Sequence, residues 1–277
     1  MRASGRAFRS MNQIFLTGLL SGLRSRGIQA VFFFGVLVVV AAYLSASFSP
    51  RHPQTVALDV GFSGGRLSLV LFALLWVQEL VVREIDRRSV FFALAYPLDR
   101  GQYLLGRYLS ILLLLFLATI LLAFMLLLIV LFAGGNYQQQ YPVLLGIAYW
   151  ATWAGLFIDA AVVAACGMLL ATLSTSAIMP LLVGLVFAVT GKSLGAVLDY
   201  LRHGADGDKV IVSNFGPALE FIQWVLPDLS RLDWRTWPMY GQAPTSELVV
   251  LGSVMAAGYT LLMLALAMRT FSRREFL

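Results

Sequence analysis

Charged residues are scarce in this chain. Asp, Glu, Lys and Arg make up only 12% of its 277 residues, whereas hydrophobic residues make up 60%. A soluble domain carries about 25% charged residues. Together with a mean hydropathy of +0.83, this composition excludes an ordinary soluble domain. It predicts an all-α protein that crosses a membrane several times.

Cysteine and histidine are also nearly absent. The single cysteine, Cys166, lies in an apolar run, so it cannot form an internal disulfide and is predicted to be a packing residue. The two histidines, His52 and His203, stand apart, and the sequence has no HExxH or similar ligand cluster. It therefore gives no support for a metal-dependent enzyme, or for a Ser/His or Cys/His nucleophilic pair.

A nucleotide-binding motif is missing as well. Gly191-Lys192-Ser193 resembles the end of a phosphate-binding loop, but that motif needs a glycine where this chain has Val186. The tripeptide also falls inside an apolar run. We therefore predict that the chain is not an enzyme and holds no catalytic residues, metal or cofactor. We expect Lys192 to extend toward the membrane surface or to pair with an acidic group.

The sequence does contain six apolar runs, each near the roughly 20 residues that a helix needs to cross a bilayer. Residues 1–277 are predicted to form a single transmembrane domain. The second run is the shortest without charge, since its charge-free part is only Leu67–Gln78. The predicted membrane-spanning helices lie at about 28–48, 63–82, 103–133, 143–172, 176–198 and 247–269.

The basic residues predict the orientation. Arginines precede the first run, lie between the second and third runs and follow the last, whereas the connection between the third and fourth runs has none. This is the positive-inside pattern, and it explains the net charge of +6 without a nucleic-acid partner. Six spans with both termini in the cytoplasm satisfy it. We expect a multi-pass protein of the plasma membrane, the inner membrane in a bacterium.

Residues 7–26 precede the first run and show a helical pattern. Apolar residues recur there at spacings of three or four and predict an amphipathic helix in the cytoplasmic interface, although Gly18 and Gly22 weaken it. The alternative is a simple basic flank. The recurring residues are Phe8, Met11, Phe15, Leu19 and Leu23.

Residues 199–246 form the longest predicted external segment. Its second half is rich in Trp and Phe but is interrupted by Pro217, Pro227 and Pro238. It is therefore too broken to span the membrane and too apolar to stay in water. We predict that it dips into the outer leaflet or packs on the bundle.

The segment from Arg83 to Leu109 is charged and lies between two apolar runs. Glu84 and Arg88 stand at i, i+4 in the favourable order, as do Glu79 and Arg83. Pro97 ends any helix at or before the preceding residue. The pattern predicts a cytoplasmic helix at about 83–95, followed by a turn and the third span.

Asp159 is the one carboxylate deep inside a predicted span. Ionisable residues at such depth are costly and often functional. One reading is a contact to a polar substrate, or a proton or ion relay. The other is an interhelical hydrogen bond or ion pair at a bundle or subunit interface, which the neighbouring small residues favour.

At Arg83 to Leu109 the chain resembles the first cytoplasmic loop of type-2 ABC exporter permeases. That loop has a Glu, a Ser or Thr, a Leu-x-x-Pro turn ending in Ser-Arg, and then Tyr-x-x-Gly-Lys. Asp99 replaces the usual serine and Arg107 the usual lysine. Leu226 to Arg235 and Phe271 to Phe276 resemble a branch that serves nitrous-oxide-reductase maturation and gliding-type systems. The loop matches are Glu84, Ser89, Leu94, Pro97, Leu98, Arg100, Tyr103, Gly106 and Arg107.

The resemblance implies a fold and partners. It implies an N-terminal interfacial helix, six spans, and re-entrant or interfacial helices between the fifth and sixth spans. It implies a homodimer or heterodimer of permeases with separate cytoplasmic ATPase subunits, which bind the ATP and Mg. Residues 83–95 would be the coupling helix, and the turn would hold Pro97, Asp99 and Arg100. The implied ATPase contacts are Glu84, Asp86, Arg87, Arg88, Val90, Phe91 and Phe92.

Two other functions stay open at this point. An ion-coupled secondary transporter would use Asp159 at its site. A membrane scaffold would transport nothing.

Overall fold

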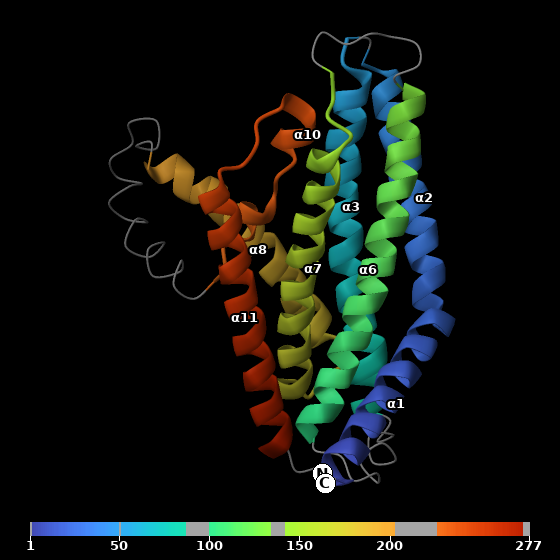
Figure 1. Ribbon diagram of the computed structural model, residues 1–277, viewed down its shortest axis with the longest axis vertical. Helices are drawn as coiled ribbons and strands as arrows, with labels where there is room; N and C mark the ends of the chain where they lie inside the picture. The colour runs from blue at the N-terminus through green and yellow to red at the C-terminus, as the bar shows by residue number, and fades with distance from the viewer. Residues whose placement is uncertain (1, 50, 87–99, 134–141, 203–225, 274–277) are drawn as a thin grey trace.

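The computed structural model describes residues 2–49, 51–86, 100–133, 142–202 and 226–273, and within them it contains helices and no strands. Figure 1 shows the long helices side by side in one elongated bundle, with both chain termini at the same end. The long helices are α1 (Arg2–Arg24), α2 (Arg26–Ser47), α3 (Pro53–Val77), α6 (Arg100–Ala133), α7 (Ile147–Leu173), α8 (Met179–Arg202) and α11 (Ser246–Arg273).

Five of the described helical stretches are long and apolar enough to cross a membrane, which fits a multi-pass membrane protein. Within the described residues of α2, Phe32–Ser47 forms a shorter apolar helical stretch, which is not among these five. The count of six therefore stays a prediction. The five stretches are Pro53–Asp86, Arg100–Ala133, Ile147–Leu173, Met179–Tyr200 and Ser246–Arg273.

The second predicted span, 63–82, is part of a longer helix. α3 begins at Pro53, which stands at the first helical position, where its missing N–H is not needed. The helix continues through a π-helix, η1 (Gln78–Val82), into α4 (Arg83–Asp86). The described part of the predicted helix 83–95 is therefore a continuation of the second span, and residues 87–95 lie outside the described residues.

The N-terminal helix, α1, packs on α6. Gly18 and Gly22 are buried, and a Cβ added at either would overlap Ser110 or Leu114 of α6. Ser110 Oγ also donates a hydrogen bond to the carbonyl of Phe15 at 3.0 Å. The glycines that weaken the helix thus allow it to lie close against α6.

The described part of the predicted external segment packs on the bundle. It contains a 3-10 helix, η3 (Leu229–Leu232), and a short helix, α10 (Thr236–Tyr240). Leu229 and Leu232 are buried in an apolar cluster with residues of α3, α7 and α8. Figure 1 shows α10 at the end of the bundle away from the termini. Residues 203–225 of this segment lie outside the described residues.

Close approach of η3 to α7 yields a prediction about stability. A Cβ at Gly155 would overlap the backbone carbonyl oxygen of Leu232, which cannot turn away as a side chain can. Gly155→Ala is therefore expected to destabilise the fold by about 1–3 kcal/mol. The measurement is the melting temperature of the purified chain in detergent.

Gly258 in α11 provides the matched control, because nothing lies within 4 Å of a Cβ added there. Gly258→Ala should leave the melting temperature unchanged or raise it, since alanine favours a helix by about 1 kcal/mol. Equal effects of the two substitutions would contradict the packing described for η3.

Candidate functional site

Asp159 is buried in the middle of the bundle and is paired with Arg66. The Nε of Arg66 donates to Asp159 Oδ2 at 2.5 Å, and the two side chains are 14% and 2% exposed. The Nη2 of Arg66 also donates to the carbonyl of Ala188 at 3.1 Å. One side chain from α3 thus joins α7 and α8. The sequence left two interpretations of Asp159 open, a functional contact or an interhelical ion pair. The structure contains the interhelical ion pair.

A second group of charges continues from this pair toward the α10 end. Lys192 of α8 donates to Asp233, so Lys192 pairs with an acidic group. Arg235 donates from Nε to Asp233 Oδ1 at 2.9 Å, and from Nη1 to Asp59 at 3.2 Å and to Ser63 at 2.7 Å. Lys192 and Asp233 also lie within electrostatic range of Asp159.

The local sequence places Asp233 and Arg235 for this role. Asp228 precedes η3, and its Oδ1 accepts from the backbone N–H of Ser230 at 3.2 Å and from its hydroxyl at 2.6 Å. This is the usual way in which an Asp side chain caps the start of a helical turn. The capped turn lies against Gly195, where a Cβ would overlap Ser230. The chain therefore leaves η3 directly beside α8 and Lys192.

Burial and charge act in opposite directions on Asp233. Burial alone raises the pKa of this carboxyl, but the hydrogen bond from Arg235 and the charges of Lys192 and Arg235 together outweigh it. The net result is a pKa below the ordinary value of 3.8. Asp233 is therefore a carboxylate at neutral pH, which the two cations require.

The described charges of this network balance, because Arg66, Lys192 and Arg235 face three carboxylates. No group of three or more metal-ligating side chains occurs within the described residues. The ion pairs join α3, α7 and α8 to the segment that contains η3 and α10. The three carboxylates are Asp59, Asp159 and Asp233.

A separate polar cluster lies where the 83–109 segment begins and ends. Glu84 accepts hydrogen bonds from the hydroxyl of Tyr103 and from Nη2 of Arg107, so α4 is tied to the first turns of α6. The Tyr103 ring stacks on Phe271 of α11, with 5.9 Å between ring centres. Arg100 donates to the carbonyl of Ser272 at 3.0 Å. Three helices therefore meet around Glu84.

The other sequence-predicted site residues divide into two groups. Asp86 is exposed at the end of α4, and Arg83 pairs with Glu79 at 3.4 Å, as the i, i+4 spacing predicts. The rest lie outside the described residues, so the structure leaves them as predictions. They are Arg87, Arg88, Val90, Phe91, Phe92, Pro97 and Asp99.

Sequence reasoning missed the cationic partner of Asp159. Arg66 interrupts the second apolar run, so the charge-free part of that run begins only at Leu67. No partner was predicted for this arginine from the sequence. A lone carboxylate and a lone guanidinium in two apolar runs are themselves a signal, because each is too costly to bury alone. The roles of Asp59 and Arg235 were also missed, since only the fold brings them together.

No protein-family model matches this chain, and a search of curated proteins found no match either. The functional argument therefore rests on the residues and on their geometry.

The Arg66–Asp159 pair can be tested by a double-mutant cycle. Arg66→Met and Asp159→Leu should each destabilise the fold by about 3–5 kcal/mol, because each leaves one buried charge without its partner. The double variant should lose much less than the sum of the two. Unfolding of the chain in mixed detergent micelles measures the three differences.

The control for this cycle is the exposed pair at Glu79 and Arg83, whose arginine side chain is 58% exposed. Arg83→Met should cost less than about 1 kcal/mol. Strictly additive losses at Arg66 and Asp159 would show that the two charges do not stabilise each other.

The lowered pKa of Asp233 predicts a pH dependence. A carboxyl whose pKa is lowered by folding stabilises the fold above its unfolded pKa and loses that contribution as pH falls through the folded pKa. Asp233→Asn should therefore lower the melting temperature at about pH 7 but much less at about pH 3. A difference between the native chain and the variant that is constant over this range would refute the ionised state of Asp233.

Proposed function

We propose that this chain is the membrane subunit of an ABC exporter and is driven by a separate ATPase. The observation that carries this proposal is the cluster around Glu84. The 83–109 segment resembles the ATPase-contacting loop of type-2 ABC exporter permeases, and both of its described ends are tied to each other through Glu84, Tyr103 and Arg107. A force applied to the loop would therefore reach α3 and α6 together.

The proposed topology has six spans, with α2 as the first and both termini in the cytoplasm. Figure 1 supports an even number, because both termini lie at one end of the bundle. The arginines near the termini and in the 83–109 segment support a cytoplasmic position for that end. In this topology, α10 and η3 lie on the outer side, and residues 87–99 are on the cytoplasmic side.

The proposed mechanism uses ATP and Mg bound by the partner subunit. Closure of the ATPase dimer pushes on the 83–95 segment, whose apolar Val90, Phe91 and Phe92 enter a groove on the ATPase. Glu84 and Arg100 pass the movement to α3, α6 and the end of α11, since Arg100 contacts α11 directly. A second permease copy completes the path between protomers.

The ion-coupled alternative would need a charge at Asp159 that becomes free during transport. The pairing of Asp159 with Arg66 accounts for its burial without a transported ion. This supports the structural reading of Asp159, and with it the exporter over the ion-coupled transporter.

The exporter proposal predicts that Phe91 is needed for ATPase binding. A tagged native chain, purified from its own membrane, should bring down a subunit that binds and hydrolyses Mg-ATP, and Phe91→Asp should lose it because a charge cannot enter an apolar groove. Co-purification followed by an ATPase assay measures both effects. Phe48→Asp is the matched control, since Phe48 is 85% exposed on the α2–α3 connection.

Three outcomes would overturn the exporter proposal. One is a native chain that brings down no ATPase, together with a Phe91→Asp variant that complements a deletion strain normally. The second is transport that survives ATP depletion but is lost in Asp159→Asn, which would establish an ion-coupled transporter. The third is a chain that never stimulates a bound ATPase in liposomes, which would leave a scaffold.

A further inference from the structure

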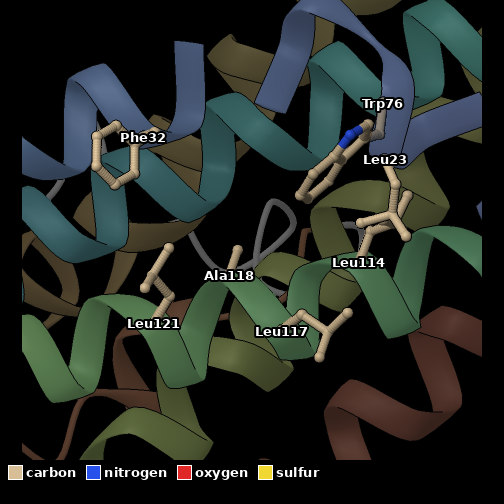
Figure 2. A pocket seen from close by; sticks show the side chains of 7 residues that line it. All are labelled: Leu23, Phe32, Trp76, Leu114, Leu117, Ala118 and Leu121. Carbon is tan, nitrogen blue, oxygen red and sulfur yellow. The ribbon is translucent and has the colours of Figure 1, made fainter. Parts of the chain in front are cut away.

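An apolar cleft lies where α1 turns into α2. It has a volume of about 190 Å³ and is bounded by α1, α2, α3 and α6. Figure 2 shows one row of side chains from α6 along it, with Trp76 and Leu23 at one end and Phe32 and Leu121 at the other. The seven lining residues are Leu23, Phe32, Trp76, Leu114, Leu117, Ala118 and Leu121.

The cleft has a buried floor and an exposed rim. Trp76, Leu114 and Ala118 are at most 5% exposed, whereas Phe32 is 58% and Leu117 45% exposed. The cleft is therefore open to the outside of the bundle. In a membrane-spanning bundle, that medium is lipid.

The size of the cleft fits a stretch of hydrocarbon chain. Leu114 and Leu121 are seven residues apart on α6, which corresponds to about 10 Å at 1.5 Å per residue. An apolar cavity of about 150 Å³ is enough to hold benzene. The lining residues are apolar apart from the indole of Trp76, so the occupant within the cleft must be apolar too.

Charge distinguishes which lipid the cleft would hold. Residues 2–47, which form α1 and α2, include five arginines and no Asp or Glu. Arg24 follows the cleft residue Leu23 directly, lies in the last turn of α1 and is exposed. A basic side chain beside an apolar cleft is complementary to an anionic headgroup joined to an acyl chain.

Trp76 supplies a further indication at the same end of the cleft. Its side chain is 2% exposed, and its Nε1 has no hydrogen-bond acceptor within the described structure. Figure 2 places this ring beside Leu23, the neighbour of Arg24 in the chain. The ester carbonyl of a phospholipid lies between its phosphate and its acyl chain and is a hydrogen-bond acceptor of the kind that this donor lacks.

We propose that the cleft between α1, α2, α3 and α6 binds one anionic phospholipid. An acyl chain fills the cleft along α6, and Arg24 holds the phosphate. The bound lipid fixes the angle between α1 and α2, because it contacts both helices and the wall behind them. This proposal rests on the membrane placement of the bundle and not on the assignment to ABC exporters.

Tryptophan fluorescence of the purified chain in lipid nanodiscs tests the proposal. Lipids brominated on their acyl chains quench nearby indoles, and brominated phosphatidylglycerol is compared with brominated phosphatidylcholine. We expect Trp76 to be quenched at about fivefold lower amounts of the anionic lipid, the preference that one basic group near the surface supplies. Trp76→Phe identifies its contribution among the six tryptophans.

The variants and controls decide between a site and general lipid contact. Arg24→Gln should abolish the preference, and Ala118→Phe should block the cleft and protect Trp76 from both lipids. Arg273→Gln, an exposed arginine of α11, and Trp150→Phe, a 40% exposed tryptophan outside the cleft, should keep the preference. Melting temperatures confirm that each variant is folded.

Two results would overturn the proposal. One is equal quenching of Trp76 by the two lipids in the native chain. The other is a preference that survives Arg24→Gln, which removes an exposed side chain and so decides the question even if Ala118→Phe does not fold.

Discussion

The ion pair between Arg66 and Asp159 is the contact on which the arrangement of the bundle depends. Neither charge can be left alone in an apolar interior, where an unpaired ion costs several kcal/mol. Arg66 also bonds the carbonyl of Ala188, so the requirement to neutralise one carboxylate fixes α3, α7 and α8 relative to one another. The position of η3 is a consequence, because Lys192 on α8 and Asp59 on α3 are in place to meet Asp233 and Arg235.

A single helix connects this network to the cluster around Glu84. Arg66 and Glu84 are 18 residues apart, which is five full turns of an α-helix, so an uninterrupted helix would place them on the same face. The π-helix at Gln78–Val82 adds one residue to a turn and rotates the next helical residues, including Glu84, by roughly a quarter turn. Arg66 therefore faces α7 and α8, whereas Glu84 faces the start of α6.

Composition and apolar runs were enough to predict an all-helical membrane protein. In lipid the backbone N–H and C=O groups must be hydrogen-bonded within the protein, and an apolar run of about 20 residues achieves this as an α-helix. The helix that holds the second predicted span begins at Pro53, ten residues before the predicted start at 63, and it contains both Asp59 and Arg66. Their partners are distant in the sequence, so no local pattern reveals that they are neutralised. The Glu84–Arg107 pair was missed for a related reason, since the i, i+4 rule drew attention to Arg88.

Glycine shows the same limit of local reasoning. In isolation, Gly18 and Gly22 lower helix propensity, and Gly191 resembles part of a nucleotide loop. In the fold all three are places of close approach, to α6 or to Leu229 of η3. The role of each glycine depends on which segment packs against it. Only the assembled bundle shows that.

Cys166 has a practical consequence. It is the single cysteine of the chain, and its thiol is buried in the apolar cluster between α3, α7 and α8. Water-soluble maleimides should not reach it while the bundle is folded. Cysteines introduced elsewhere can therefore carry spin labels or fluorophores in an otherwise native background, and a signal from Cys166 itself would report unfolding.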